Sequence, residues 1–415
     1  MYRGATHMKK CKLGAIGSYA QYQQHKIKKK QYTVLGLIGL LLVSVFIVTG
    51  RFNEDLQNLL SIGKMKIQPT KQSVYLMSPK IDYSVYAAPE TAKGIYVPLS
   101  KIKDYEEYIK LAKQTEINSF VIDIKDDLGY LTFSTDNENL KDKGIVLDNP
   151  PIKDVEKMMN RLCEANIYPI ARVVAFKDDV VARNNPELAV KSVDGSTYKT
   201  SSNNTWLNPY KKENWEYLLE VSKEAIRLGF KEIQFDYVRF HESMNEKRVI
   251  LDGPESKSEI ITQFINYICE HLHEEGIKVS ADVFGAVVLS DIDAEIVGQN
   301  FKEMSKHLDY ICPMVYPSHY AEGTFGIKYP HIEVYKIINK TMKLGLEKIK
   351  DSEGRHTAVI RPWLQDFTIK SVEPYLEYGP KEIRGQIQGA NDAGVDERLL
   401  WNPAGNYTKE GLMAQ

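Results

Sequence analysis

The sequence predicts an α/β protein whose main part is a (β/α)8 TIM barrel, preceded by an N-terminal transmembrane helix and a stalk. Three observations support the barrel. Strand-like segments alternate with helical segments from residue 94 onward. The strand segments are continuous apolar runs, as expected for parallel strands that are covered on both faces. The alternation reaches eight strands, the number that closes this barrel. An open doubly wound sheet is the main alternative, but no G-x-G-x-x-G motif follows the first strand to support its dinucleotide-binding version.

Eight segments carry the strand prediction. They are GIYVPL (94–99), SFVIDIK (119–125), YPIARVVAF (168–176), EIQFDYVRF (232–240), KVSADVFG (278–285), LDYICPMVYP (308–317), TAVIRPWLQDF (357–367) and RLLWNPAGNY (398–407). The segments between them have helical periodicity. In VEKMMNRLCEANI, for example, apolar residues recur at positions 155, 158, 159 and 162, which is the spacing of one helix face.

The residues before the barrel predict a membrane anchor. The run at 32–50 carries no charge and is about as long as a bilayer-spanning helix. Lysines directly before this run predict that its N-terminal side stays in the cytoplasm. We therefore expect a cytoplasmic segment at 1–31, a transmembrane signal anchor at 32–50, a stalk at 51–92 and an extracellular barrel domain at 93–415. A cleaved signal peptide, which would leave a secreted protein, is the alternative.

The composition argues against several function classes. The formal net charge is −1, so the chain has no overall basic field that would attract nucleic acid. The four cysteines include no C-x-x-C pair, and the nine histidines include no His-x-x-x-His spacing. We therefore expect no metal and no cofactor.

The fourth predicted strand carries the first candidate catalytic residue. Its alternation directs Ile233 and Phe235 toward the helices and directs Gln234, Asp236 and Val238 into the barrel. A carboxylate buried without a partner costs several kcal/mol, so its presence in this strand needs a reason. Active sites of TIM barrels lie at the C-terminal ends of the strands. The sequence therefore predicts that Asp236 faces a substrate cleft.

The same alternation sends polar or aromatic side chains from other strands toward the same end of the barrel. These side chains are Asp123 of the second strand, Arg172 of the third, Asp282 of the fifth, Tyr316 of the sixth, and Arg361 and Trp363 of the seventh. We interpret this convergence as an active site. The alternative is that the aspartates and arginines form a structural ion network.

Asp236, Asp282 and Asp123 are the candidate catalytic residues. Glycoside hydrolysis needs two carboxyl groups, one that protonates the leaving oxygen and one that attacks the anomeric carbon or activates water. Asp236 and Asp282 lie on adjacent strands, and Asp123 lies across the barrel. Neighbouring arginines, Arg172, Arg239 and Arg361, could keep one carboxylate ionised while another stays protonated.

Aromatic and polar side chains near the same end are candidate substrate-binding residues, because flat aromatic faces suit pyranose rings. The aromatic candidates are Trp206, in the polar loop after the third strand, and Tyr316, Trp363 and Trp401 at or just past strand ends. The polar candidates are Gln234, Arg172, Arg239 and Arg361.

Several segments resemble a bacterial family of glycoside-hydrolase-like barrel proteins that is catalogued as a domain of unknown function. The most specific of them are FDYVRF (235–240) and RPWLQDF (361–367), and the resemblance covers roughly residues 93 to 410. It implies a barrel fold and a hydrolase class without a defined substrate. An Asp at the end of the fourth strand is also similar to the nucleophile position of amylase-type barrels. That similarity would assign the nucleophile to Asp236, whereas the fifth strand offers Asp282 where that group has a Glu.

These features together predict a membrane-anchored, extracytoplasmic glycoside hydrolase that cleaves a cell-surface or extracellular polysaccharide. Its expected partners are a poly- or oligosaccharide substrate and the lipid bilayer, with neither nucleic acid nor metal. A non-catalytic barrel that binds cell-wall glycan is the alternative.

Overall fold

The computed structural model describes residues 88–350 and 355–413. The predicted cytoplasmic segment, the predicted transmembrane helix at 32–50 and the predicted stalk up to residue 87 lie outside these residues. Within the described part, none of the helices combines the length and the apolar character needed to cross a bilayer.

The described residues form one parallel sheet of nine strands. The strands are β1 (Lys93–Val97), β2 (Ser119–Lys125), β3 (Tyr168–Val174), β4 (Glu232–Asp236), β5 (Lys278–Phe284), β6 (Tyr310–Met314), β7 (Val359–Ile360), β8 (Trp363–Gln365) and β9 (Arg398–Trp401). Each of the eight predicted strand segments overlaps one of these strands, and the seventh overlaps both β7 and β8.

The sheet closes on itself. Strands β1 to β6 pair in sequence order, and β9 joins β1 to β8, which pairs with β6. Strands β7 and β8 are two parts of the seventh barrel strand, separated by Arg361 and Pro362. Pro362 has no N–H for a sheet ladder, which explains the break, while its carbonyl still accepts a hydrogen bond from the Leu399 N–H at 2.9 Å. Eight strand positions therefore form a barrel, and the TIM-barrel prediction is confirmed.

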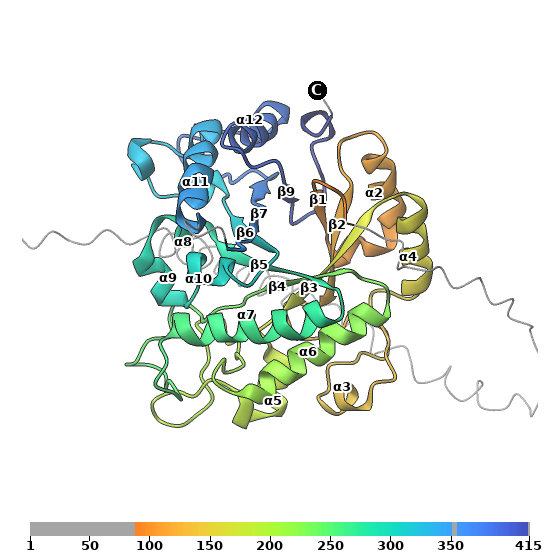
Figure 1. Ribbon diagram of the computed structural model, residues 1–415, viewed down its shortest axis with the longest axis vertical. Coiled ribbons are helices and arrows are strands. Elements are labelled where there is room, and N and C mark those ends of the chain that lie inside the picture. Colours follow the sequence, from red (N-terminus) through yellow and green to blue (C-terminus); the bar gives the residue numbers. More distant parts are fainter. Residues whose placement is uncertain (1–87, 351–354, 414–415) are drawn as a thin grey trace, which may run out of the picture. The chain divides into compact units, whose positions relative to one another are not determined.

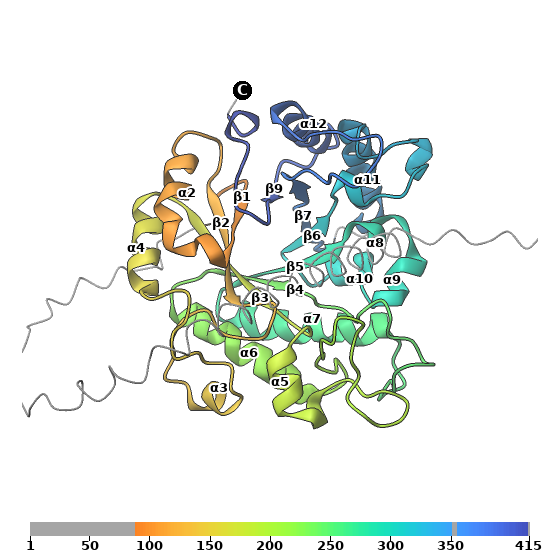
Figure 2. The ribbon, with the colours of Figure 1, turned by 180° about the vertical axis from the view of Figure 1, so that it is seen from behind.

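Helices surround the sheet, as the two opposite views in Figures 1 and 2 show. The helices are α2 (Tyr105–Ala112), α3 (Glu138–Asp142), α4 (Val155–Glu164), α5 (Asp179–Asn184), α6 (Lys212–Arg227), α7 (Lys257–Glu274), α8 (Gly285–Leu289), α9 (Asp291–Val297), α10 (Phe301–Ser305), α11 (Val334–Ile349) and α12 (Pro380–Asn391). Helices α6 and α7 lie side by side, α6 against β3 and α7 against β5. Helix α7 begins with a capping box in which Ser256 and Glu259 each accept a hydrogen bond from the other's backbone N–H.

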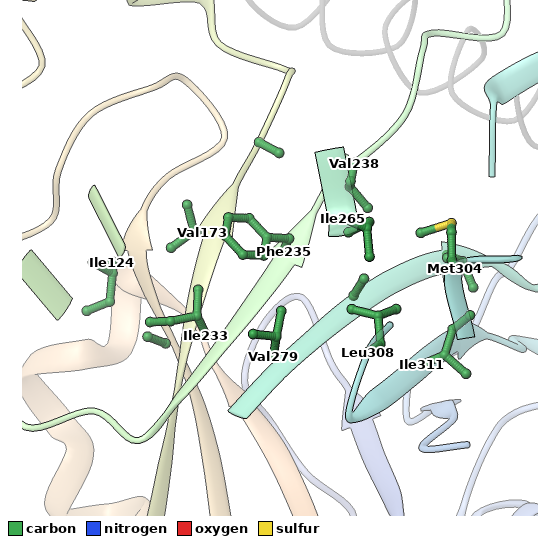
Figure 3. Packing of buried hydrophobic residues seen from close by; sticks show 14 of the residues in the cluster. Ile124, Val173, Ile233, Phe235, Val238, Ile265, Val279, Met304, Leu308 and Ile311 are labelled. Carbon is green, nitrogen blue, oxygen red and sulfur yellow. The ribbon is translucent and has the colours of Figure 1, made fainter. Parts of the chain in front are cut away.

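The main hydrophobic core fills the space between the sheet and the helices. Ile233 and Phe235 of β4 point into it, and in Figure 3 they lie near Val173 of β3, Val279 of β5 and Ile265 of α7. The alternation predicted for β4 is therefore confirmed for its two outward residues. The alternate residues of the strand, Gln234 and Asp236, therefore face the barrel interior.

The fourth strand ends earlier than predicted. The ladder stops at Asp236, because Tyr237 has a φ of 51°, which turns the backbone out of the extended conformation. The predicted alternation therefore does not extend to Val238. This side chain packs in the outer hydrophobic core (Figure 3) and not in the barrel interior.

Candidate active site

Arg172 is the centre of the polar network at the C-terminal end of the barrel. It is almost fully buried on β3 and reaches three aspartates. Its Nη1 donates to Asp123 at 2.6 Å, and its Nη2 donates to Asp127 at 2.9 Å. Its Nε and Nη2 both donate to Oδ2 of Asp236, at 3.1 and 2.6 Å. Burial opposes the charge of Arg172, but the three carboxylates raise its pKa well above the ordinary value, so the guanidinium stays charged.

Asp282 lies beside Asp236 but in a different environment. Phe235 pairs with Ala281 in the ladder between β4 and β5, so the next residue of each strand brings the two aspartates together. The indole Nε1 of Trp363 donates to Asp282 at 2.7 Å. No cationic side chain of the described residues forms an ion pair with Asp282. Burial, and then the charge of Asp236, raise the pKa of Asp282 well above its usual range.

Asp123 is the third predicted carboxylate, and it is held from two sides. Arg172 binds one of its oxygens, and the hydroxyl of Tyr96 donates to the other at 2.6 Å. Burial raises the pKa of Asp123, and the contacts with Arg172 and Tyr96 offset this rise only in part. The structure thus brings the three predicted catalytic aspartates into one network around Arg172 and Trp363.

Aromatic rings line one side of this network. Trp401 stacks on Tyr96 with ring centroids 4.2 Å apart, and it meets Trp363 edge-on at 5.7 Å. Trp401 is partly exposed, whereas Trp363 is buried. Tyr316 lies after β6 and packs edge-on against Phe367 at 5.6 Å. Of the predicted aromatic candidates, Trp401 therefore offers the most accessible ring. Trp363 is buried, and its indole N–H donates a hydrogen bond to Asp282.

Arg361 and Gln234 do not reach the C-terminal end of the barrel. Arg361 pairs with Glu232, the first residue of β4, at 2.7 Å and with Glu397, which precedes β9, at 2.5 Å. Its guanidinium also lies 3.5 Å from the ring centroid of Tyr310, the first residue of β6. Gln234 is fully buried and donates to the Cys312 sulfur at 3.4 Å. The prediction that Arg361 lines the substrate opening is therefore corrected, because its long side chain extends toward the N-terminal ends of the strands.

The loop after β4 carries Arg239 and contacts Trp206. Trp206 is 2% exposed, so it is not the open sugar platform that its polar loop predicted. Its ring lies edge-on to Tyr237 at 5.9 Å and 5.2 Å from the guanidinium carbon of Arg239. The positive φ of Tyr237 is uncommon for a bulky residue, and such conformations are concentrated at functional sites.

Two residues of the network were absent from the sequence prediction. Tyr96 faces the interior from β1, where Ile95 and Val97 face the outer core. The same alternation that selected Asp236 would have selected it. Asp127 is the second residue after β2, is about half exposed, and binds both Arg172 and Lys177. It lies on a loop, where alternation gives no information.

Among the described residues, no group of three or more His, Cys, Asp and Glu side chains is arranged to hold a metal ion. The aspartates of the network instead take their hydrogen bonds from Arg172, Tyr96 and Trp363.

Comparison with known proteins gives a family match. Residues 94–407 match the family model described as "Putative glycosyl hydrolase domain", which confirms the resemblance seen in the sequence. No curated protein matches the chain. A hypothetical protein from Ruminiclostridium thermocellum ATCC 27405 is 39% identical, with a TM-score of 0.42, and the alignment covers 46% of this chain and 97% of that one.

Two further solved structures have lower sequence identity to this chain. The glycoside hydrolase domain of PgaB (BpsB) from Bordetella bronchiseptica is 13% identical, with a TM-score of 0.51, over 79% of this chain and 100% of that one. The spore cortex-lytic enzyme SleL from Bacillus megaterium QM B1551 is 11% identical, with a TM-score of 0.46, over 78% of this chain and 74% of that one. The likeness to the PgaB domain shows a shared fold.

Proposed function

The chain belongs to the family described as "Putative glycosyl hydrolase domain", and we propose that it is a glycoside hydrolase that cleaves a cell-surface or extracellular polysaccharide. Asp236 and Asp282 are the proposed carboxyl pair. Asp123 positions Arg172, and Trp401 contributes a flat surface for a sugar ring.

The observation that carries this proposal is the contrast between two neighbouring carboxyl groups. Asp236 receives two hydrogen bonds from the Arg172 guanidinium and so has a charged donor as its partner. Asp282 is buried beside that negative charge, with the neutral Trp363 indole as its hydrogen-bond donor. Pairs of carboxyl groups whose surroundings favour opposite protonation states are a recurrent basis for acid–base assignment in enzymes.

The proposed mechanism follows from this contrast. Asp282, whose raised pKa favours its protonated form, donates the proton to the glycosidic oxygen that leaves. Asp236, which is paired with Arg172, either attacks the anomeric carbon or orients a water molecule toward it. When Asp282 gives up its proton, the nearby Arg172 charge stabilises the carboxylate that forms. General acid catalysis of this kind typically contributes a factor of about 10²–10⁴.

One observation favours a second candidate, a barrel that binds glycan without cleaving it. Both carboxylate oxygens of Asp236 are already engaged, Oδ2 by Arg172 and Oδ1 by the backbone N–H of Tyr237 at 2.6 Å. A nucleophile must release at least part of these contacts to react.

Two substitutions separate the candidates. In a hydrolase, Asp236→Asn and Asp282→Asn each lower the release of reducing ends from a bacterial cell-wall polysaccharide by at least about 10²-fold, while pull-down of the same glycan persists. Asp392→Asn is the matched control, because Asp392 is exposed at the C-terminal end of α12 and its side chain binds Tyr335 and Gln388, outside the network. If the unmodified protein cuts no polymer and the two substitutions leave glycan binding unchanged, the binding barrel is correct.

The proposed location is the outer face of a cell membrane, with the helix at 32–50 as an anchor. This part of the proposal rests on the uncharged run at 32–50 and on the lysines before it. Protease treatment of intact cells should release the barrel domain while the N-terminal segment stays with the membrane. Protection of the barrel domain in intact cells would contradict it.

A further inference from the structure

Arg239 is a buried cation with an unusual set of partners. Its side chain is 6% exposed, yet among the described residues only one carboxylate forms an ion pair with it, Glu242 at 3.5 Å from Nη1. Nη1 also donates to the backbone carbonyl of Phe240 at 3.0 Å. Within residues 88–350 and 355–413, no acceptor binds the Nε and Nη2 donors of Arg239. Neither nitrogen is among the fully buried side-chain atoms that lack a hydrogen-bond partner, so this edge of the guanidinium is open to a ligand.

The comparison with Arg172 identifies the type of ligand. Arg172 uses the same edge, Nε together with Nη2, to hold the carboxylate of Asp236. Two parallel N–H donors in one plane match the two oxygens of a carboxylate, which makes this edge a common binding site for carboxylates. In Arg172 the edge is filled by the protein itself, whereas in Arg239 it has no acceptor in the part of the chain that the structure describes.

Aromatic rings enclose the Arg239 guanidinium. Its carbon Cζ lies 4.3 Å from the ring centroid of Phe284, 5.1 Å from that of Tyr237 and 5.2 Å from that of Trp206. These rings hold the guanidinium in place by cation–π attraction.

Two of the residues around Arg239 lie close to the proposed catalytic pair along the chain. Tyr237 follows Asp236 directly, and Phe284 lies two residues beyond Asp282 on β5. With a strand rise of about 3.3 Å per residue, Phe284 is roughly 7 Å further along the strand than Asp282. A group bound to Arg239 would therefore belong to the sugar at the bond to be cleaved or to the sugar next to it.

We propose that Arg239 binds the carboxylate of an acidic sugar, so that the substrate is a carboxylate-bearing glycan such as a uronic-acid or muramic-acid polymer. This inference rests on the proposed glycan-cleaving function of the same site. It assigns to Arg239 the recognition of the substrate charge and to Trp206, Tyr237 and Phe284 the positioning of its guanidinium.

Binding of small acidic sugars to the full-length protein tests the proposal without requiring cleavage. Three matched pairs serve as probes: glucuronate and glucose, galacturonate and galactose, and N-acetylmuramate and N-acetylglucosamine. We expect at least one acid to bind about tenfold more tightly than its neutral partner. Arg239→Gln should abolish this preference, and Arg239→Lys, which keeps the charge but loses the planar pair of donors, should weaken it about fivefold or more. Arg227→Gln is the matched control, because Arg227 is an exposed arginine at the C-terminal end of α6.

Each other outcome overturns the inference. Equal binding of acid and neutral sugar, or an undiminished preference in Arg239→Gln, removes the role of Arg239. Inorganic phosphate or sulfate that competes as well as the best acidic sugar contradicts the preference for a planar carboxylate. If Arg239→Gln fails to fold, Arg239→Lys decides the question.

A cleavage assay then tests the role of Arg239 and the proposed hydrolase activity separately. The same cell-wall polysaccharide is compared before and after chemical reduction of its carboxylates to alcohols, and the reduced polymer should be cut at least tenfold more slowly. If neither polymer is cut but acid binding depends on Arg239, the hydrolase proposal fails and the assignment of Arg239 stands. If both polymers are cut equally, the hydrolase proposal stands and the assignment of Arg239 fails.

Discussion

The two ends of the barrel interior each bury an arginine among carboxylates, yet they differ in how completely those carboxylates are paired. At the N-terminal end, Arg361 lies between Glu232 and Glu397, and Ser280 donates a further hydrogen bond to Glu232. At the C-terminal end, Arg172 is shared by three aspartates, and Asp282 beside them has no cation of the described residues as an ion-pair partner.

The two ends also differ in contact with solvent. The side chains of Glu232 and Glu397 are 0% and 10% exposed, and that of Asp236 is 12% exposed, so the difference comes from Asp127, which is 48% exposed. A buried ion pair is therefore weak evidence for function by itself, because both ends contain one. The more informative feature is a carboxyl group without a cation, next to one that has a cation, at the end of the barrel where solvent reaches.

Removal of Arg361 should have the largest effect on stability. Arg361→Met leaves Glu232 and Glu397 buried without their cation, and breaking a buried pair in this way costs about 3–5 kcal/mol. Urea unfolding of the variant measures this loss. Arg227→Met, in which an exposed pair with Glu224 is lost, should change the free energy of unfolding by less than about 1 kcal/mol. Equal effects of the two variants would mean that the N-terminal end does not stabilise the fold as described.

The pH dependence of stability should distinguish Asp282. Its pKa is raised in the folded protein, and the unfolded value is about 3.9. The folded state therefore holds this proton more tightly than the unfolded state, and the stability that Asp282 contributes at low pH is lost as the pH rises from about 4 toward the folded pKa. Asp282→Asn cannot ionise and should gain thermal stability relative to the unmodified protein between pH 4 and pH 8. A constant difference in Tm across this range would contradict the assignment.

The raised pKa of Asp282 also predicts how the rate of glycan cleavage changes at alkaline pH. Because the proposed acid must carry its proton, the rate of glycan cleavage should fall as the pH rises through the pKa of Asp282. A pH–rate profile measures this fall. A rate that stays constant far into the alkaline range would exclude Asp282 as the acid.

The smallest expected effect concerns the aromatic surface. Trp401→Ala removes a partly exposed ring that stacks on Tyr96 and should weaken glycan binding by roughly 1 kcal/mol, about fivefold in Kd. Its stability loss should be smaller than that of Trp215→Ala, since Trp215 of α6 is buried in the outer core and such truncations cost about 3–5 kcal/mol. Unchanged glycan binding in Trp401→Ala would remove this ring from the site.

Much of the fold could be predicted because its signals are local. The eight apolar runs and the helical spacing between them depend on residues close in sequence. The alternation within each run then identified which side chains enter the barrel, including Asp123, Arg172, Asp236 and Asp282. It failed beyond Asp236, because the backbone conformation of Tyr237 that ends β4 has no signature in a run of apolar residues.

The sequence by itself determined the barrel, the family and the set of polar side chains that face its interior. Only the tertiary structure decided at which end of the barrel each side chain lies and which partner it binds. Arg172 and Arg361 are indistinguishable by alternation, but one binds Asp123 and Asp236 near the C-terminal ends of the strands and the other binds Glu232 near the N-terminal ends. The physical reason is that alternation fixes the face on which a side chain lies, whereas its charge state depends on neighbours from distant parts of the chain that only the closed barrel brings within hydrogen-bonding distance.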